Sequence, residues 1–121
     1  MQNLKTILIV DDSSGPRNSL QMILEPFYGV YTAADGFEAL RCFQTEKIDL
    51  VTLDLEMPGL SGIEVLREMK KIKKGVPVII ITGQNDLSKV REAISQGAED
   101  FLSKPFIIHE VTKVVATALP N

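Results

Sequence analysis

Four short apolar segments of this chain each lead into polar residues that could take part in phosphate chemistry. They are residues 7–10, followed by Asp11 and Asp12; 50–53, followed by Asp54; 78–81, followed by Thr82; and 101–103, followed by Lys104. If the segments are parallel strands of one sheet, their carboxyl ends lie along one edge. Three carboxylates, a hydroxyl and an ammonium group would then converge at that edge.

The acids Asp11, Asp12 and Asp54 need a cation if they share one site. Two carboxylates a few ångströms apart repel each other by about 4 kcal/mol at an effective dielectric of roughly 20. A site made of carboxylate oxygens favours Mg²⁺, which keeps several waters and completes its octahedron with phosphate oxygens. Alternatively, Asp11 and Asp12 cap the next helix or lie solvated in a turn, but the coincidence with Asp54 at a second strand end weakens that interpretation.

Asp54 is the candidate nucleophile, because a carboxylate can attack phosphorus and form an acyl phosphate. Such a transfer depends on positioning and on neutralising the oxygens of the phosphoryl group. A divalent cation would cover one side of that group and Lys104 another, while Thr82 would donate a hydrogen bond to a phosphoryl oxygen. Lys104 precedes Pro105, and an X–Pro bond can be cis. Taken singly, Thr82 and Lys104 are ordinary strand-end and surface residues, so their combination with the acids carries the prediction.

Residues 55–60 are expected to form a loop that shapes access to the acyl phosphate. Met57, Pro58 and Gly59 make a turn signal. A backbone carbonyl of this loop, which we assign to Glu56, could reach the metal. The side chain of Glu56, two residues after Asp54, could flank an incoming water molecule or phosphoryl donor.

Length and composition indicate one ordinary globular domain spanning residues 1–121. The apolar fraction of 45% and the charged fraction of 24% are typical of soluble proteins. The net charge of −3 argues against direct nucleic-acid binding by the chain alone. Neither a signal peptide after Met1 nor a membrane span of ~18 apolar residues is present. We therefore expect a cytoplasmic protein that does not associate with membranes.

The apolar pattern alternates between two types along the chain. Runs rich in Ile and Val, typical of strands covered on both faces, span roughly 6–10, 28–33, 49–54, 76–82 and 99–103. Helical spacing between them is marked by five apolar sets: Leu20, Ile23, Leu24 and Phe27; Phe37, Leu40 and Phe43; Ile63, Leu66, Met69 and Ile72; Leu87, Val90, Ile94 and Ala98; Val111, Val114, Val115 and Leu119. Asp35 and Ser61 are expected to cap the second and third helices, whereas the start of the fifth is weakly marked.

This alternation predicts an α/β fold of the (βα)₅ type, a doubly wound, five-stranded parallel sheet with helices on both faces. Open sheets of this kind bind ligands beyond the carboxyl ends of their strands, where the strand order switches. The sequence does not fix the strand order by itself, and 2-1-3-4-5 is the expected order for five strands.

Three further features have plain structural interpretations. Cys42, the single cysteine, is expected to fill a helix face in a reducing compartment. His109, the single histidine, is expected to be a partly exposed helix residue and not a phosphohistidine. The four lysines within residues 70–74 suit a solvated helix end and its macrodipole, with a docking patch as the alternative.

The constellation resembles the receiver domain of two-component response regulators, which have a flavodoxin-like fold of the chemotaxis-regulator type. The resemblance covers essentially the whole chain and is carried by residues 7–12, 54–62, 81–83 and 104–106. It implies that Asp54 is the phosphoacceptor and that Asp11 and Asp12 are acids of a Mg²⁺ (or Mn²⁺) site. It also implies that Thr82 and Lys104 contact the phosphoryl group.

A mechanism and partners follow from the same resemblance. A sensor histidine kinase or a histidine phosphotransfer protein would donate a phosphoryl group to Asp54, with the receiver supplying the metal and much of the catalysis. Thr82 would then move toward the phosphoryl group, and Phe101, at the family's switch aromatic, would move inward. This would remodel the face of the fourth helix, fifth strand and fifth helix. Alternatively, Phe101 is a core aromatic that never moves.

The implied role is that of a phosphoacceptor signalling module, which is not an enzyme although it assists its own phosphorylation and slow dephosphorylation. We expect a monomer or a dimer that forms on phosphorylation. Because Phe101 has no hydroxyl, its switch would depend on burial. Glu56 and Gln84 sit at positions that tune hydrolysis of the acyl phosphate. The chain ends at Asn121, so we expect either a stand-alone regulator of an unknown downstream protein or a piece separated from its output domain.

Three other functions fit parts of the pattern. An aspartyl-phosphate hydrolase of the haloacid dehalogenase type requires an Asp-x-Asp motif, which Asp54-x-Glu56 matches only in part. Such an enzyme also usually has a cap insertion, for which this chain has no room. A flavodoxin-like cofactor binder requires a Ser/Thr/Gly-rich phosphate loop after the first strand, where this chain has Asp11 and Asp12. A degenerate receiver used as a scaffold is disfavoured, because the acids, Thr82 and Lys104 are all present.

Overall fold

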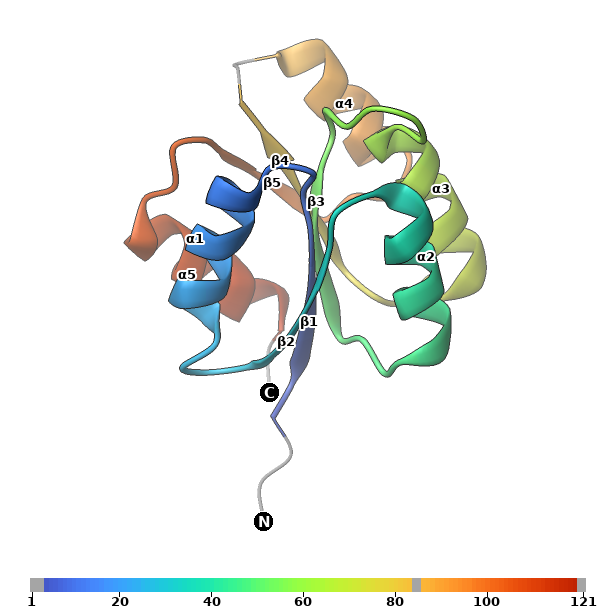
Figure 1. Cartoon of the computed structure of the whole chain (residues 1–121). Helices are drawn as coiled ribbons and strands as arrows, with labels where there is room; N and C mark the ends of the chain where they lie inside the picture. Colours follow the sequence, from blue (N-terminus) through green and yellow to red (C-terminus); the bar gives the residue numbers. More distant parts are fainter. Residues whose placement is uncertain (1–3, 84–85, 120–121) are drawn as a thin grey trace.

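The computed structural model describes residues 4–83 and 86–119, in which five strands alternate with five helices (Figure 1). The elements are β1 Thr6–Val10, α1 Ser14–Leu24, β2 Gly29–Ala33, α2 Gly36–Thr45, β3 Leu50–Asp54, α3 Gly62–Ile72, β4 Val78–Thr82, α4 Leu87–Ser95, β5 Asp100–Ser103 and α5 Ile108–Ala118. This confirms the predicted (βα)₅ order. Gln84, predicted to tune hydrolysis, lies outside the described residues.

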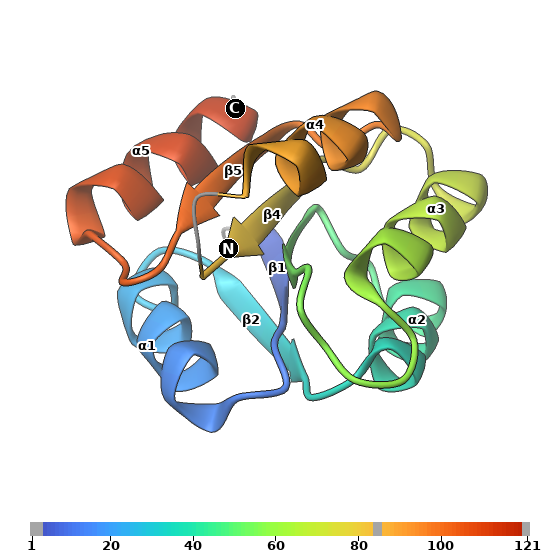
Figure 2. The same cartoon turned by 90° about the horizontal axis from the view of Figure 1, so that it is seen from above.

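The five strands are all parallel and lie in the order β2-β1-β3-β4-β5, as expected. Helices α1 and α5 cover one face of the sheet, and α2, α3 and α4 cover the other (Figure 2). The order switches between β1 and β3, which are direct neighbours with Val10 paired to Leu53. The carboxyl ends of these two central strands therefore lie side by side at the switch point.

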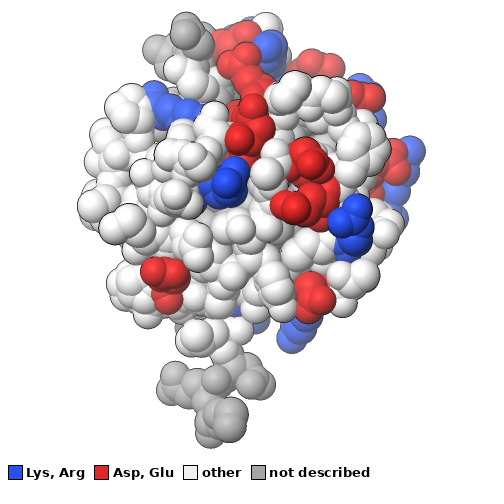
Figure 3. Space-filling view, in the orientation of Figure 1, with Lys and Arg blue, Asp and Glu red and all other residues white. Residues whose placement is uncertain are grey.

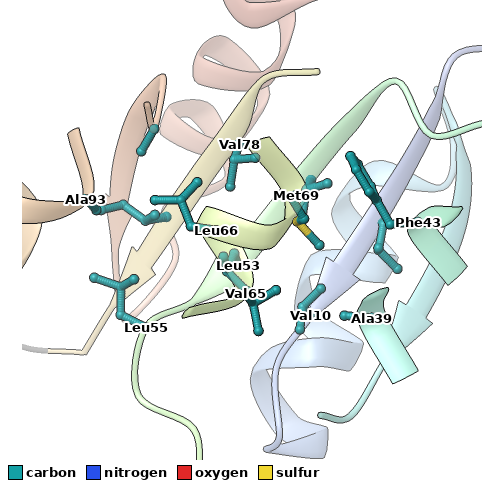
Figure 4. Packing of buried hydrophobic residues seen from close by; sticks show 14 of the residues in the cluster. Val10, Ala39, Phe43, Leu53, Leu55, Val65, Leu66, Met69, Val78 and Ala93 are labelled. Carbon is teal, nitrogen blue, oxygen red and sulfur yellow. The ribbon is translucent and has the colours of Figure 1, made fainter. Parts of the chain in front are cut away.

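Two apolar layers hold the helices to the sheet. Along β1, Ile7 and Ile9 pack toward α1 and α5, whereas Leu8 and Val10 pack toward the other three helices. The second layer, with Phe43 between α2 and the sheet, is shown in Figure 4. Because successive strand residues point to opposite faces, continuous apolar runs fill both layers. No helix in the described ranges is both long and apolar enough to cross a membrane.

The expectation that every strand is covered on both faces is wrong for the two edge strands. In β2 the middle residues Tyr31 and Thr32 are exposed, and in β5 so are Asp100 and Phe101. An edge strand has a neighbour on one side alone, so the helices cover it incompletely. The three central strands carry the continuous apolar runs that the sequence pattern describes.

Several apolar residues that mark the predicted helices lie at the surface. Phe27 follows the end of α1, and Phe37 occupies the first turn of α2 outside its buried stripe. In α4, Leu87 and Ile94 are exposed while Val90 and Ala93 face the core. The last residue of α3, Ile72, is also partly exposed. The spacing located the five helices, although Ala98 and Leu119 lie beyond the ends of α4 and α5. It did not fix which edge of the apolar stripe faces the sheet.

The predicted helix starts are confirmed by hydrogen bonds. Asp35 Oδ1 accepts from the backbone N–H of Glu38 at 2.8 Å, and Ser61 forms a reciprocal capping box with Glu64. At the start of α5, Ile107 provides no side-chain cap, as its residue type predicts. Cys42 is half-buried against the core, and this burial raises the pKa of its thiol, which suits a packing role.

The expectation that the lysines within residues 70–74 form a solvated helix end is wrong for two of them. Lys70 donates to the carbonyl of Val76 at 2.8 Å, and its stem lies over Gly97. Lys73 donates to the carbonyls of Phe43 and Glu46 at the end of α2, at 3.2 and 3.4 Å. These two ammonium groups therefore join α3 to neighbouring segments.

Candidate functional site

The acids after β1 and at the end of β3 converge as parallel strand ends require. Asp11, Asp12 and Asp54 each place one carboxylate oxygen within 4.8 Å of the others. Figure 3 shows acidic side chains gathered over the upper centre of the molecule, where the strands end. This arrangement joins the adjacent residues Asp11 and Asp12 with Asp54, which is distant in the sequence, in one anionic pocket.

Two of the three carboxylates are buried. Asp11 is 1% exposed and Asp54 is 2% exposed, whereas Asp12 is open to solvent. The backbone N–H of Ser13 donates to Asp11 Oδ1 at 2.9 Å, and that of Glu56 donates to Asp54 Oδ1 at 3.0 Å. One oxygen of each buried acid is thereby fixed by its own loop, and the other faces the pocket.

Lys104 closes the pocket from the end of β5. Its Nζ lies 3.1 Å from Asp11 Oδ2 and 3.4 Å from Asp54 Oδ2, so one cation pairs with both buried acids. Burial by itself lowers the pKa of this ammonium, but the two carboxylates outweigh it and raise the pKa above its ordinary value. The backbone N–H of Lys104 donates to the carbonyl of Thr82, and the bond to Pro105 is cis.

The pocket holds more negative charge than Lys104 can balance. The pKa of Asp54 is raised from 3.8 to about 6, mainly by burial and in addition by the nearby charge of Asp11. The N–H of Glu56 and the charge of Lys104 oppose this shift without cancelling it. An additional cation would relieve the excess charge.

The residues present fit a hard divalent cation such as Mg²⁺. Three carboxylates supply oxygen ligands of the kind that this ion prefers. Asp11 Oδ2 is buried and accepts no hydrogen bond from the described part of the chain; its contact with Lys104 is an ion pair. Its lone pairs are therefore available to a metal.

The other predicted site residues lie around this pocket. Thr82 is 3% exposed at the end of β4, beside the strand that carries Asp54. Phe101 is 39% exposed, so it is not a buried core aromatic. The Glu56 carboxylate pairs with Lys89 and is not a member of the acid cluster found among the described residues. His109 is exposed in the first turn of α5.

Sequence reasoning missed two basic residues that touch this region. Arg17 in α1 donates to the carbonyl of Asp11 at 2.8 Å, and Lys89 in α4 reaches Glu56 across 33 residues of sequence. The only signal for Arg17 was its position one helical turn after Ser13. No local pattern could have indicated the Lys89 contact, because it depends on how α4 is placed.

Sequence reasoning also missed a groove that begins beside Lys104 and runs between α1 and the start of α5. Its lining residues are Pro16, Ser19, Met22, Ile23, Gly83, Lys104, Pro105, Phe106 and Ile108. Met22 and Ile108 are 73% and 65% exposed, so the groove presents apolar side chains to solvent. The groove thus joins an apolar surface to the charged pocket.

Comparison with known proteins connects this site to a family. Residues 7–116 match the family described as "Response regulator receiver domain". The chain is 40% identical to sporulation initiation phosphotransferase F of Bacillus subtilis, covering 99% of this chain and 97% of that protein. It is 39% identical to the alkaline phosphatase synthesis transcriptional regulatory protein PhoP of the same organism, covering 95% of this chain but 48% of that protein.

Solved structures show the same fold. A CheY-like response regulator receiver domain protein from Methanospirillum hungatei superposes with a TM-score of 0.92 at 30% identity, covering 97% of this chain and 94% of the other. A receiver domain protein from Clostridium thermocellum gives 0.89 at 37% identity, covering 96% and 94%. The agreement extends over the whole (βα)₅ unit that positions the pocket.

Proposed function

The chain belongs to the response regulator receiver domain family of two-component systems, and on this premise we propose that it accepts a phosphoryl group on Asp54 from a protein phosphohistidine and thereby acts as a switch. The observation that carries this proposal is the buried carboxylate of Asp54 at the end of β3, 3.4 Å from the ammonium of Lys104 and beside two further acids. The proposal assigns these residues as the nucleophile, a cation that pairs with it, and acids that could hold a metal.

In the transfer step, a carboxylate oxygen of Asp54 forms a bond to phosphorus and the bond between phosphorus and the donor's imidazole nitrogen breaks. The nitrogen keeps the bonding electrons, and an imidazole protonated on its other nitrogen leaves as a neutral group. In this proposal Lys104 neutralises one phosphoryl oxygen, and Thr82 donates a hydrogen bond to another. A Mg²⁺ ion, held by Asp11, Asp12, Asp54 and the Glu56 carbonyl, would supply the remaining charge neutralisation.

The switch would follow from the new charge at Asp54. A phosphoryl group adds a charge of about −1.5 to −2 and three acceptor oxygens. Thr82 is buried at the adjacent strand end, so a small displacement of its hydroxyl toward the phosphoryl group would open space behind it. Phe101 on β5, now partly exposed, would turn into that space and remodel the face of α4, β5 and α5.

The proposed donor is a sensor histidine kinase or a histidine phosphotransfer protein. Two features support a protein donor: the apolar groove beside Lys104, and the relative named as a phosphotransferase, which this chain matches over nearly its whole length. The chain spans about half of the relative named as a transcriptional regulator. The downstream target is therefore proposed only as a protein that contacts the switching face.

Incubation with acetyl phosphate or phosphoramidate and Mg²⁺ tests the proposal. Intact-mass spectrometry should show the mass of one added phosphoryl group on the wild type and none on Asp54→Asn. Asp35→Asn is the matched control, because this exposed helix cap should stay functional as Asn. A wild type that gains no phosphoryl group, or an Asp54→Asn variant that still gains one, would contradict the assignment.

A further inference from the structure

An ion pair bridges the two segments that flank the phosphoacceptor pocket. Lys89 Nζ, in the first turn of α4, lies 3.4 Å from Glu56 Oε2 in the loop after β3. Both side chains are about half exposed, so water reaches them. The pair links residues that are 33 positions apart, and it is the contact by which the side chain of Glu56 is tied to another element among the described residues.

Glu56 is joined to Asp54 through its backbone and to α4 through its side chain. Its N–H donates to Asp54 Oδ1 at 3.0 Å, which places the start of the Glu56 side chain next to the acceptor carboxylate. Its carboxylate nevertheless turns away from the acid cluster and toward Lys89. Because the Glu56 backbone contacts Asp54 Oδ1, rotation about its side-chain bonds would move this carboxylate relative to Asp54.

The backbone of Lys89 is held in place independently of the ion pair. Asp86 caps α4, and its Oδ1 accepts hydrogen bonds from the Lys89 backbone N–H at 3.3 Å and from the Ser88 hydroxyl at 2.8 Å. Because this cap holds the backbone of the first turn, the Lys89 side chain extends from a fixed position toward Glu56. The cap of α4 therefore holds the Lys89 backbone in place beside the Glu56 carboxylate.

We propose that Lys89 is a positioning residue of the phosphoacceptor site, which holds the Glu56 carboxylate away from the phosphorylated Asp54 and so lengthens the lifetime of the acyl phosphate. This inference rests on the proposed function, since it concerns the same pocket. It adds a residue of α4 whose charge regulates how long the switch stays on. When Lys89 is lost, Glu56 is free to turn toward Asp54 and to accept a hydrogen bond from a water molecule there.

The affected step is hydrolysis of the acyl phosphate. The water oxygen forms a bond to phosphorus, and the bond between phosphorus and the Asp54 oxygen breaks. The bonding electrons return to Asp54 as a carboxylate, and both protons of the water leave with the inorganic phosphate. A carboxylate that orients the water speeds this step, because the reacting atoms are then held in line.

The ionic contact between two half-exposed groups sets the size of the effect. Such pairs change equilibria or rates by about two- to fivefold, and the effect weakens as salt screens the charges. We expect Lys89→Gln to shorten the acyl phosphate lifetime by about two- to fivefold at low salt. Raising NaCl from about 0.05 to 0.5 M should shorten the lifetime of the wild type toward that of the variant and leave the variant nearly unchanged.

The experiment follows the loss of the phosphoryl group by intact-mass spectrometry after the small-molecule donor is removed, with Mg²⁺ kept constant. The variants are Lys89→Gln, Lys89→Arg, Glu56→Gln and the Glu56→Gln/Lys89→Gln double variant. Lys89→Arg should keep the wild-type lifetime, because it keeps the charge. In the Glu56→Gln background, Lys89→Gln should have no further effect, since the carboxylate that it positions is gone.

Lys71→Gln is the matched control, because Lys71 is an exposed lysine paired with Glu68 at 3.1 Å in α3, away from the pocket. It should leave the lifetime unchanged. Equal lifetimes for the wild type and Lys89→Gln, a longer lifetime in Lys89→Gln, or an undiminished effect in the Glu56→Gln background would each overturn the inference. Failure of the proposed function would be distinct, because the wild type would then acquire no phosphoryl group to lose.

Discussion

Between α2, α3 and the sheet, the chain buries apolar side chains such as Phe43, Leu66 and Met69, whereas at the ends of β1 and β3 it buries the carboxylates of Asp11 and Asp54. Burial of each apolar side chain stabilises the folded state. Burial of the two acids destabilises the folded state, because desolvation and mutual repulsion outweigh the attraction of Lys104. Removing an apolar side chain from the first region should therefore lower stability, whereas removing a charge from the second should raise it.

The largest effect is expected in the apolar layer, from Phe43→Ala. Phe43 is fully buried, so its truncation leaves a cavity and should lower the free energy of unfolding by about 3–5 kcal/mol. Phe37→Ala is the matched control on the same helix, because Phe37 is 66% exposed and should cost less than about 0.5 kcal/mol. Urea unfolding measures both, and similar losses would show that α2 does not turn Phe43 inward and Phe37 outward.

Gly62→Ala should show how tightly the apolar layer and the pocket are joined. A Cβ at Gly62 would lie 2.5 Å from Leu55 Cα and 2.6 Å from the carbonyl oxygen of Asp54, so backbone must move. We expect a loss of about 1–3 kcal/mol together with slower phosphorylation of Asp54. Gly75→Ala, where a Cβ has open space, is the control. Unfolding curves and phosphorylation rates that match the wild type would contradict the close packing of the loop after β3.

Asp54→Asn should stabilise the protein in metal-free buffer by about 1–2 kcal/mol at pH 7–8. The pKa of Asp54 rises from 3.8 to about 6 on folding, so the folded state binds more protons between these values. The wild type therefore loses stability as pH rises from about 4 to 6, and the Asn variant lacks that loss. The advantage should vanish below about pH 4, where both states of the wild type are protonated.

Thermal or urea unfolding across pH, with a chelator present, measures this difference. Mg²⁺ should then stabilise the wild type more than Asp54→Asn, because the variant has lost a carboxylate ligand. An Asn variant that is less stable than the wild type at neutral pH without metal would mean that the pocket is not strained by its own charge.

The smallest effect is expected from Thr52→Val. Thr52 is fully buried in β3, two residues before Asp54, and its hydroxyl has no hydrogen-bond partner in the described part of the chain. Replacing it with a methyl group should leave stability equal or raise it by up to about 1 kcal/mol. Phosphorylation should be unaffected. A loss above about 1 kcal/mol in urea unfolding would show that the hydroxyl has a partner that stabilises the fold.

The fold and the acid pocket were predictable because they depend on local and periodic signals. Apolar runs in β1, β3 and β4 require a covered parallel sheet, and parallel strands must bring their ends together. Asp54 and Lys104 could therefore be assigned to one edge without coordinates. The helix caps at Asp35 and Ser61 were predictable for a similar reason, since each is a contact within four residues.

Features that depend on how whole elements dock were not predictable. Spacing treats Phe37 and Phe43 alike, and only the rotation of α2 against the sheet buries one and exposes the other. The sequence predicts a solvated Lys73, and only the packing of α3 beside the end of α2 lets its ammonium donate to the carbonyls there. The pairing of Lys89 with Glu56 likewise needs the position of α4. Each is a tertiary contact that leaves no trace in local sequence.

The most direct test of the central claim is to locate the acyl phosphate in the chain. Borohydride reduces an acyl phosphate on aspartate to homoserine, which peptide mass mapping can place at a single position. After treatment with acetyl phosphate and Mg²⁺, we expect homoserine at position 54 and unchanged aspartate at positions 11 and 12. Homoserine at either of those positions, or at no position in a protein that has gained a phosphoryl group, would contradict the assignment of Asp54 as the phosphoacceptor.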